Sequence, residues 1–332
     1  MRVAPVGDAG SLVDSDNPDF DLLEAAFLAS LDVRQQSLRL YRWAIRRYFR
    51  WVRESGRRLG FITRVDLLEY KRYLSEYVRP ETGKTLTAQT VNTYIIVLRL
   101  FYAWTLREGK YPNIAYKLKG LKCRDEFVKQ PFKEAQLNLI LENCLQMNCR
   151  TVVRDYAILS LLIYTGIREI EAIRAVISDR QAMGDRTILW VQGKGRDRKD
   201  NWVVLPQPAI DAIDAYLATR PDARPNDPLF VTQGMSPRQR NTPMTQRMMQ
   251  GITKKYIRAV GIDFHEYSGH SFRHSAARMM MREGASLFDV QNVLRHSNPA
   301  TTQRYLRAFV KEERLDSPKE DLIARALGSD RQ

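Results

Sequence analysis

The stretch that decides the character of this chain lies near its C-terminal end, where residues 270–305 read HSFRHSAARMMMREGASLFDVQNVLRHSNPATTQRY. Two shorter stretches belong with it, TGIREIE at residues 165–171 and GKG at residues 193–195. Together they hold the six residues on which the functional prediction depends: Arg168, Lys194, His270, Arg273, His296 and Tyr305. Two arginines, a lysine and two imidazoles could surround a phosphate, and a tyrosine could attack it.

Transfer of a phosphodiester requires three kinds of chemical group. It needs a nucleophile in line with the leaving oxygen, positive charge around the non-bridging oxygens, and a proton for the departing alkoxide. Arginine suits the second role, because its planar fork meets two phosphate oxygens and keeps its charge. The six residues therefore predict that the chain breaks and rejoins DNA through a covalent tyrosine link.

The charge of the chain points to the same class of partner. At 332 residues it is long enough for two domains, and its hydrophobic fraction of 44% is ordinary for a globular protein. Its formal net charge of +15 indicates a polyanionic partner, for which nucleic acid is the leading candidate. An anionic membrane surface is the alternative, but it would require a basic amphipathic segment or a lipid anchor as well.

Cysteine use and the N-terminal residues predict a cytosolic protein, and a DNA partner would associate it with the nucleoid. Three cysteines without a paired framework suit a reducing compartment, and residues 1–18 contain no apolar run typical of a signal peptide. The most apolar stretch, residues 156–164, is too short to span a bilayer. His270 and His274 could belong to a metal site, but no Cys or carboxylate has the spacing to complete it, so we expect no metal and no cofactor.

Hydrophobic periodicity divides the chain into parts. Residues 1–20 are polar and acidic and predict a loose tail, whereas residues 21–112 carry helical periods. Residues 113–132 predict a basic linker, and residues 133–332 a second domain. The helices expected are 22–31 (with Asp21 as N-cap), 35–54, 66–77, 87–107, 137–145, 152–164, 168–176, 208–218, 244–260, 271–283, 286–295 and 300–309. Residues 187–191 and 202–205 predict a β-hairpin with Lys194 near its turn, and the rest of 206–243 predicts surface loop.

Three groups of residues are the candidates for DNA contact. The helix at 35–54 has a row of arginines with only Glu54 nearby: Arg39, Arg42, Arg46, Arg50, Arg53 and, just beyond, Arg57. The first turns of the helix at 87–107 carry short polar side chains: Thr87, Gln89, Thr90, Asn92 and Thr93. The linker adds Lys119 and Lys122. The alternatives are a solvated basic face, ordinary helix capping by Thr87 and a solvated connector.

From Arg168 to Tyr305 the chain resembles the tyrosine recombinases, the phage integrase family, especially its simple two-domain Xer-like members. The boxes at 270–274 and 294–305 carry the resemblance, with 23 residues from Arg273 to His296 and nine from His296 to Tyr305. Two positions depart from the family pattern: Ile170 replaces a small polar residue, and Arg295 replaces a glycine. The fold that the resemblance implies is mostly α with a small β-sheet, in which an α-helical, SAM-like core-binding domain precedes a mixed α/β catalytic domain.

The resemblance also implies a role for each residue. Tyr305 would form a 3′-phosphotyrosyl link and free a 5′-hydroxyl, while Arg168 and Arg273 clamp the scissile phosphate. Lys194 would protonate the leaving oxygen, with Lys199 as the alternative acid. The remaining roles are proton transfer at the tyrosine for His270, a hydrogen bond to the phosphate for His296, and support of the site for Glu171. Neither ATP nor metal is needed, because the phosphotyrosyl bond keeps the energy of the cut backbone.

The partners implied are double-stranded DNA with inverted half-sites and further copies of the chain. A dimer would occupy each site, and a tetramer would exchange strands through a Holliday junction. An apolar stripe at 317–327 predicts an exchange helix that docks on a neighbouring copy or folds back on its own. An accessory factor or a partner recombinase is a further candidate. Two rival functions are a non-catalytic sequence-specific DNA-binding protein and a type IB topoisomerase-like enzyme.

Overall fold

A computed structural model describes residues 19–123, 129–193, 196–233, 240–295, 302–307 and 309–310. The chain forms two compact units, Met1–Arg124 and Asp125–Gln332, each with its own hydrophobic core. The predicted tail lies, up to residue 18, outside the described residues, as does the predicted exchange helix at 317–327. No described helix is both long enough and apolar enough to cross a membrane.

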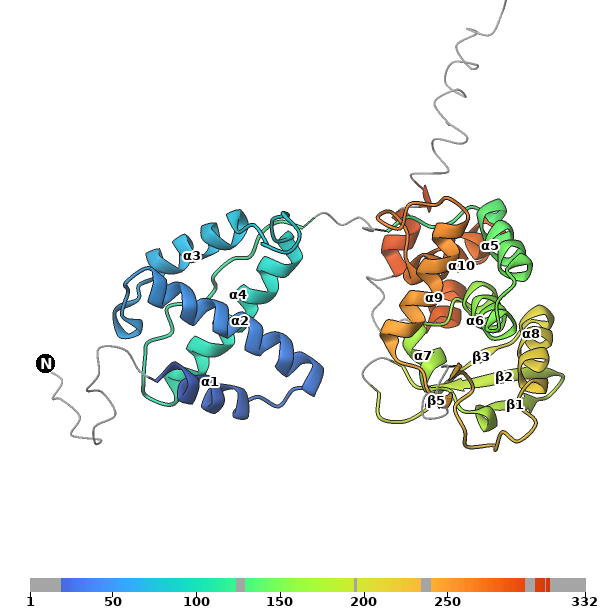
Figure 1. Cartoon of the computed structure of the whole chain (residues 1–332). Helices are drawn as coiled ribbons and strands as arrows, with labels where there is room; N and C mark the ends of the chain where they lie inside the picture. The colour runs from blue at the N-terminus through green and yellow to red at the C-terminus, as the bar shows by residue number, and fades with distance from the viewer. Residues whose placement is uncertain are drawn as a thin grey trace, which may run out of the picture. The chain divides into compact units, whose positions relative to one another are not determined.

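The named elements in the described part of the first unit are all helices (Figure 1), and an isolated antiparallel bridge pairs Val78 with Thr85. Its elements are α1 (Phe20–Ala29), α2 (Gln35–Glu54), a 3₁₀ turn (Leu59–Phe61), α3 (Arg64–Glu76) and α4 (Ala88–Arg107). The predicted N-cap Asp21 is wrong by two residues, because the carboxylate of Asp19 accepts the backbone N–H groups of Asp21 and Leu22. Helix α3 begins earlier than predicted, because Thr63 and Asp66 form a capping box.

Aromatic side chains fill the core of the first unit. Tyr48 and Phe101 are fully buried and their rings meet edge to face. The buried hydroxyls of Tyr48 and Tyr102 lie 2.5 Å apart in a hydrogen bond, so neither is left unsatisfied in the apolar interior.

Both ends of the segment predicted as a linker pack against a unit. On the first unit, Ala115 and Leu118 are buried, and Arg64 Nη1 donates to the carbonyl of Tyr116 at 2.7 Å. On the second, Lys129 Nζ donates to the carbonyl of Phe264 at 3.0 Å, and the backbone N–H of residue 132 donates to Ser275 Oγ at 2.7 Å. Both ends of this segment are therefore part of a folded unit.

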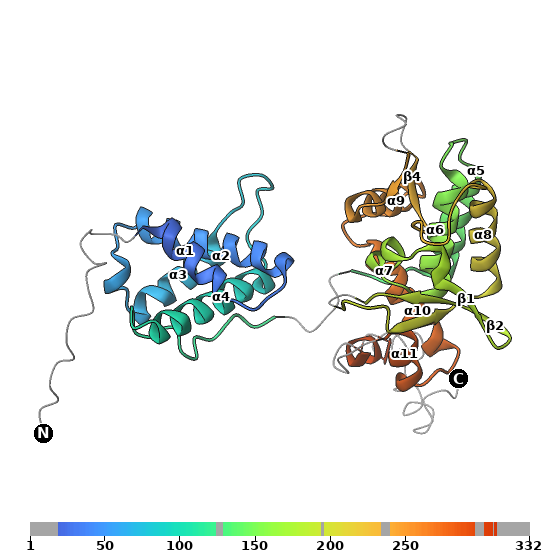
Figure 2. The ribbon, with the colours of Figure 1, turned by 90° about the horizontal axis from the view of Figure 1, so that it is seen from below.

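Helix α6 (Val152–Thr165) lies at the centre of the second unit, between α8 (Gln207–Ala218) on one side and α9 (Gln246–Ala259) and α10 (Gly269–Arg282) on the other (Figures 1 and 2). Its central place explains why every side chain from 157 to 163 is buried, a stretch that the sequence shows as an apolar run interrupted by Ser160. The surrounding helices are α5 (Glu134–Gln146), α7 (Glu169–Arg174) and α11 (Leu287–Leu294), and residues 302–307 are also helical.

The predicted hairpin is confirmed as β2 (Arg186–Val191) and β3 (Asn201–Val204), with Trp190 opposite Trp202. A further strand, β1 (Arg180–Met183), extends it to an antiparallel sheet in the order β1-β2-β3. The sequence did not reveal β1, because this short edge strand is largely exposed and has no apolar alternation. The loop predicted for 206–243 is wrong at β4 (Val231–Gln233) and β5 (Arg240–Pro243), which pair with each other. The predicted fold class, mostly α with small sheets, is confirmed.

Candidate active site

The site begins at the turn that ends α6. Gly166 has φ +59°, and a Cβ added there would lie 2.9 Å from both Ala276 Cβ and Leu294 Cδ2. A glycine is therefore required both by the left-handed backbone and by the close approach of α10 and α11. The carbonyl of Gly166 accepts a hydrogen bond from Arg273 Nη1 at 2.8 Å. The turn thus fixes one arginine of the site and directs the chain into α7.

Arg168 and Glu171 form the next layer of the site. Arg168 Nη1 donates to Glu171 Oε1 at 2.7 Å, and the backbone N–H of Arg168 donates to Glu171 Oε2 at 3.0 Å. Glu171 is only 1% exposed. Burial by itself would raise the pKa of its carboxyl, but the guanidiniums of Arg295 and Arg168 outweigh burial and lower that pKa. Glu171 is therefore a buried, ionised support for Arg168.

Arg273 is buried with its guanidinium aimed at backbone carbonyls. Besides Gly166, the carbonyl of Leu294 at the end of α11 accepts a hydrogen bond from Arg273 Nη2. Burial, and then the positive charge of Arg168, lower the pKa of Arg273 to about 9. Arg273 is still protonated at neutral pH. Arg168 and Arg273 are therefore two neighbouring cations in a poorly solvated site, and a bound phosphate would relieve their repulsion.

Tyr305 lies against this cluster from the helical segment 302–307. The residue is 6% exposed and packs with Ala277, Met281, Val290 and Leu294. Burial raises the pKa of its phenol, whereas the charges of Arg273 and Arg168 lower it, so the net shift is upward. Tyr305 therefore lies beside the two guanidiniums that would hold a phosphate, and its phenol is protonated until it reacts.

The two described histidines of the 270–274 box occupy different environments. His270 is exposed in the first turn of α10, where it can meet a substrate. The ring of His274 meets the ring of Tyr305 edge to face, with centroids 5.2 Å apart. Burial, then the proximity of His270, lower the pKa of His274 to about 4, so this imidazole is neutral at physiological pH. The sequence marks His274 only as a candidate metal ligand and carries no signal for its contact with Tyr305.

Lys194 and His296 lie outside the described residues. The loop that leads to Lys194 does start beside the site, because a Cβ added at Gly193 would lie 4.0 Å from Glu171 Oε1. Lys199 is already in an ion pair, since its Nζ lies 2.6 Å from a carboxylate oxygen of the buried Asp179. Within the described residues, no three His, Cys, Asp or Glu side chains gather where they could hold a metal ion.

The arginine row on α2 is exposed, as its spacing predicts, but it is not free of acidic neighbours. Glu24 on α1 lies 2.7 Å from Arg46 Nε and 3.3 Å from Arg42 Nε. Arg57 binds Asp66 at 2.8 Å and also Glu69, which makes it part of the fold. The expectation that only Glu54 is near the row is therefore wrong. Opposite charges from α1 and α3, distant in sequence, partly neutralise it.

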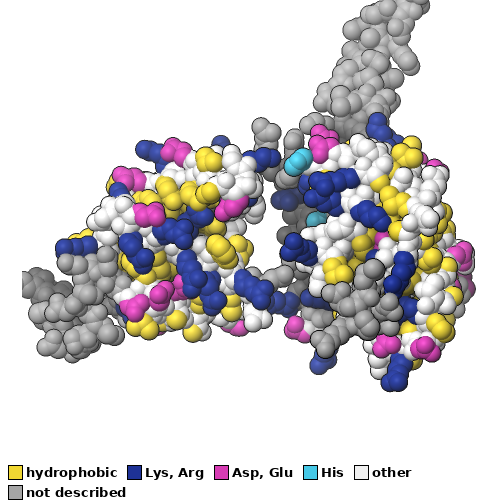
Figure 3. Space-filling view, viewed as in Figure 1, with side chains coloured by type: hydrophobic (Ala, Val, Ile, Leu, Met, Phe, Trp, Pro, Cys, Tyr) yellow, Lys and Arg dark blue, Asp and Glu magenta, His cyan; other side chains and the backbone are white. Residues whose placement is uncertain are grey.

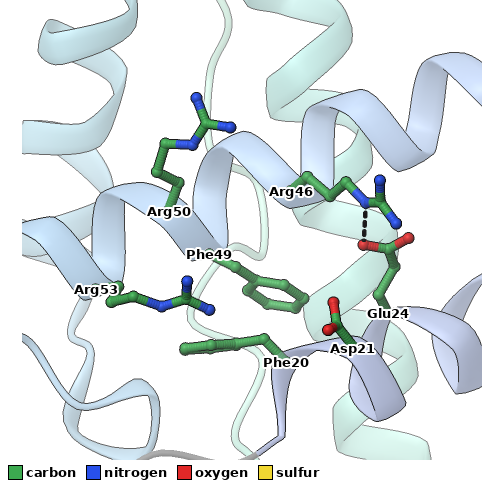
Figure 4. A pocket seen from close by; sticks show the side chains of 7 residues that line it. All are labelled: Phe20, Asp21, Glu24, Arg46, Phe49, Arg50 and Arg53. Carbon is green, nitrogen blue, oxygen red and sulfur yellow. Dashed lines mark hydrogen bonds and ion pairs between the residues drawn. The ribbon is translucent and has the colours of Figure 1, made fainter.

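Two hollows of about 230 and 250 Å³ follow this row. The first lies between α1 and α2, where Arg50 and Arg53 flank the stacked rings of Phe20 and Phe49 (Figure 4). The second is lined by arginines around Trp43, whose side chain is 69% exposed. Figure 3 shows Lys and Arg side chains interleaved with hydrophobic ones on this unit. Basic and aromatic groups together are typical of surfaces that bind nucleic acid.

The polar residues at the start of α4 are partly committed to the fold. Thr87 caps the helix by accepting the backbone N–H of Thr90, and Thr93 Oγ1 donates to the carbonyl of Gln89 at 3.0 Å. The side-chain amide of Asn92 both donates to the carbonyl of Leu121 at 2.9 Å and accepts its backbone N–H at 2.6 Å. Gln89, Lys119 and Lys122 are exposed. Asn92 therefore has less capacity for a contact with DNA than its position in the sequence implies.

Comparison with known proteins assigns this arrangement to a family. The profile described as Phage integrase family matches residues 130–312, and the one described as Phage integrase, N-terminal SAM-like domain matches residues 25–109. The chain belongs to the phage integrase family. It is a tyrosine site-specific recombinase, as the resemblance of its boxes implies.

Two relatives illustrate its place among these recombinases. Tyrosine recombinase XerD of Xanthomonas axonopodis pv. citri is 29% identical over 289 residues, which cover 84% of this chain and 89% of XerD. Tyrosine recombinase XerC of Bacillus subtilis is 29% identical over 228 residues, covering 67% of this chain and 71% of XerC.

Solved structures share the fold at lower identity. XerH site-specific recombinase bound to palindromic difH substrate has a TM-score of 0.71 at 20% identity, covering 91% of this chain and 85% of XerH. A lambda integrase tetramer bound to a Holliday junction has a TM-score of 0.63 at 16% identity, covering 86% of this chain and 75% of the integrase.

Proposed function

We propose that this recombinase cuts one DNA strand at a time by the attack of Tyr305 on the scissile phosphate. The Oη of Tyr305 forms a bond to phosphorus, and the bond from phosphorus to the 5′-oxygen breaks. The phenol proton passes toward His270, and Lys194 gives a proton to the departing 5′-oxygen. The product is a 3′-phosphotyrosyl link and a 5′-hydroxyl, and the reverse attack by a 5′-hydroxyl rejoins the DNA.

One observation carries this proposal: Tyr305 lies beside Arg168 and Arg273, and the buried Glu171 holds Arg168. Arg168 directly precedes α7 and Arg273 lies on α10, and each is fixed by hydrogen bonds within the protein. Fixed donors of this kind stabilise the charge that develops on the non-bridging oxygens without a cost of reorganisation. His296 would add a further donor to the phosphate.

The ion pair of Lys199 with Asp179 favours Lys194 as the general acid. Lys199 Nζ is engaged by Asp179, a residue that is 7% exposed, and breaking this pair would leave a buried carboxylate without its partner. Lys194 follows Gly193, which lies beside Glu171. A proton donor carried by this loop would therefore start close to the phosphate site.

The DNA partner would be a duplex site with inverted half-sites, bound by two copies of the chain. Four copies would exchange strands through a Holliday junction. The DNA-bound states of XerH and of the lambda integrase tetramer support this proposal, as does the net charge of +15. In this scheme residues 21–112 bind the core site, residues 133–332 carry catalysis, and an accessory factor or a partner recombinase is a further candidate.

Within the first unit, we assign the contacts with the DNA backbone to the exposed arginines of α2. Arg46, Arg50 and Arg53 line the hollow of Figure 4, and Arg46 also shares the charge of Glu24 with Arg42. Arg39, Thr87, Gln89, Thr90 and Thr93 complete the candidate interface on α2 and α4. Lys119 and Lys122 would follow the DNA backbone beyond it.

A covalent trapping assay tests the function. The full chain would be incubated, without metal or ATP, with nicked duplexes drawn from the DNA that flanks its own gene. We expect a protein–DNA species that resists denaturing electrophoresis and is absent with Tyr305→Phe. Tight sequence-specific binding without an adduct would favour the non-catalytic rival. Adducts on every duplex regardless of sequence would favour the topoisomerase-like rival.

A further inference from the structure

Arg295 occupies a backbone position that does not suit its side chain. It follows α11 with φ +55° and ψ +50°, in the left-handed region that glycine adopts most readily. Among the described residues, only Lys117 shares this combination of a side chain and a positive φ. A disfavoured backbone is retained at a functional site when its side chain does something there, so the contacts of Arg295 need an explanation.

The guanidinium of Arg295 is buried in the site. Its Nη2 lies 3.1 Å from Glu171 Oε2, and its Nη1 donates to the carbonyl of Val293 at 2.7 Å. The side chain is 8% exposed. Burial lowers the pKa of Arg295 and the charge of Glu171 raises it, with burial the larger effect. Because an arginine keeps its proton at neutral pH even so, a third cation lies inside the site.

Glu171 therefore serves two guanidiniums, one on each carboxylate oxygen. Arg168 binds Oε1 and Arg295 binds Oε2. With Arg273 included, three cations and one anion give a formal charge of 3 − 1 = +2. Without Arg295 the sum would be 2 − 1 = +1, and the whole charge of Glu171 would act on Arg168.

Arg295 is also joined to the second phosphate-binding arginine through the backbone. The carbonyl of the preceding residue, Leu294, accepts the hydrogen bond from Arg273 Nη2. The left-handed turn at Arg295 begins directly after that carbonyl. Arg295 therefore affects Arg168 through the shared carboxylate of Glu171, and affects the orientation of Arg273 through the Leu294 carbonyl.

We propose that Arg295 is a positioning residue for DNA cleavage: it takes up part of the charge of Glu171 and so leaves Arg168 free to attract the scissile phosphate. This inference rests on the proposed function, since it assumes that the arginines hold a phosphate. It assigns a role to the position where the chain departs from its family's glycine.

The test is a double-mutant cycle on the full chain, with the nicked duplex that traps the wild-type protein as substrate. Arg295→Met removes the charge but keeps the length of the side chain, and we expect it to slow single-turnover adduct formation at saturating protein at least tenfold. Adding Glu171→Gln to Arg295→Met returns the formal charge to +2. We expect this double variant to react at least threefold faster than Arg295→Met, but below the wild-type rate, because the amide that replaces the Glu171 carboxylate cannot accept both hydrogen bonds from Arg168.

The cycle separates an electrostatic role from a merely structural one, because removing a second side chain of the cluster would not restore a damaged turn. Arg295→Gly relaxes the backbone without replacing the charge, so it should be as slow as Arg295→Met. The inference is overturned if Arg295→Met or Arg295→Gly reacts within twofold of the wild-type rate, or if the double variant is no faster than Arg295→Met. Absence of an adduct with the wild-type protein would refute the proposed function instead.

Discussion

Replacing Gly166 by alanine tests whether the turn after α6 organises the site through close packing. The new Cβ would lie 2.9 Å from Ala276 Cβ and from Leu294 Cδ2. The leucine methyl can move, but the Cβ of Ala276 is fixed to helix α10. Gly184 provides a matched control in the same unit, because its φ of +61° is nearly the same as the +59° of Gly166 and a Cβ there would meet nothing within 4 Å.

Both substitutions change the free energy of unfolding through the left-handed backbone, but only Gly166→Ala also changes it through packing. A side chain in the left-handed region costs about 1–2 kcal/mol, and the stiffer unfolded chain returns about 0.4–1 kcal/mol. We therefore expect Gly184→Ala to destabilise the second unit by about 1 kcal/mol. Overpacking adds about 1–3 kcal/mol at Gly166, for a total of about 2–4 kcal/mol.

Native-state hydrogen exchange of the α6 amides measures this difference within the second unit, independently of the first. An excess of about 1–3 kcal/mol makes those amides of Gly166→Ala exchange roughly 5 to 150 times faster than those of Gly184→Ala. Gly166→Ala should also slow adduct formation, because its carbonyl positions Arg273, whereas Gly184→Ala should not. Equal exchange in the two variants, or a wild-type rate for Gly166→Ala, would refute the packing argument.

Three further predictions follow from single contacts. Lys199→Met should still form the adduct but unfold at a lower temperature, because it leaves the buried Asp179 carboxylate without its cationic partner. Lys194→Met should lose the adduct. If Lys199→Met loses the adduct at full stability, Lys199 and not Lys194 is the general acid. Arg50→Ala should reduce the slope of log affinity against log salt by about 0.9, measured by fluorescence anisotropy, and an unchanged slope would remove Arg50 from the interface. The pKa of His274 is about 4 in the folded state against 6.5 unfolded, so the unfolded chain binds the extra proton and stability falls as pH drops from 6.5 toward 4. His274→Asn should abolish this loss of about 1.4 kcal/mol per pH unit below 6.5, and identical pH curves for the two proteins would contradict it.

The sequence by itself determined the chemistry and most helices. The nucleophile, the arginines and the imidazoles stand in short boxes whose order can be read along the chain, because each box is a local stretch of backbone. The period of apolar residues likewise gave α2 to the residue, because a helix with one buried face repeats its pattern over five turns. The short strands β1, β4 and β5 have no such signal, since three or four residues are too few to show a period.

Only the tertiary structure decided which side chains meet. Glu24 against Arg46, Asp179 against Lys199 and Glu171 against Arg295 are pairs separated by 22, 20 and 124 positions, and no local pattern links their members. The same holds for Asn92, whose place in a polar turn predicted a DNA contact but whose amide binds the backbone of Leu121. The physical reason is that a charge or an amide finds its partner through the packing of whole helices. Sequence shows which chemical groups are available, and the packing determines which of them are already engaged.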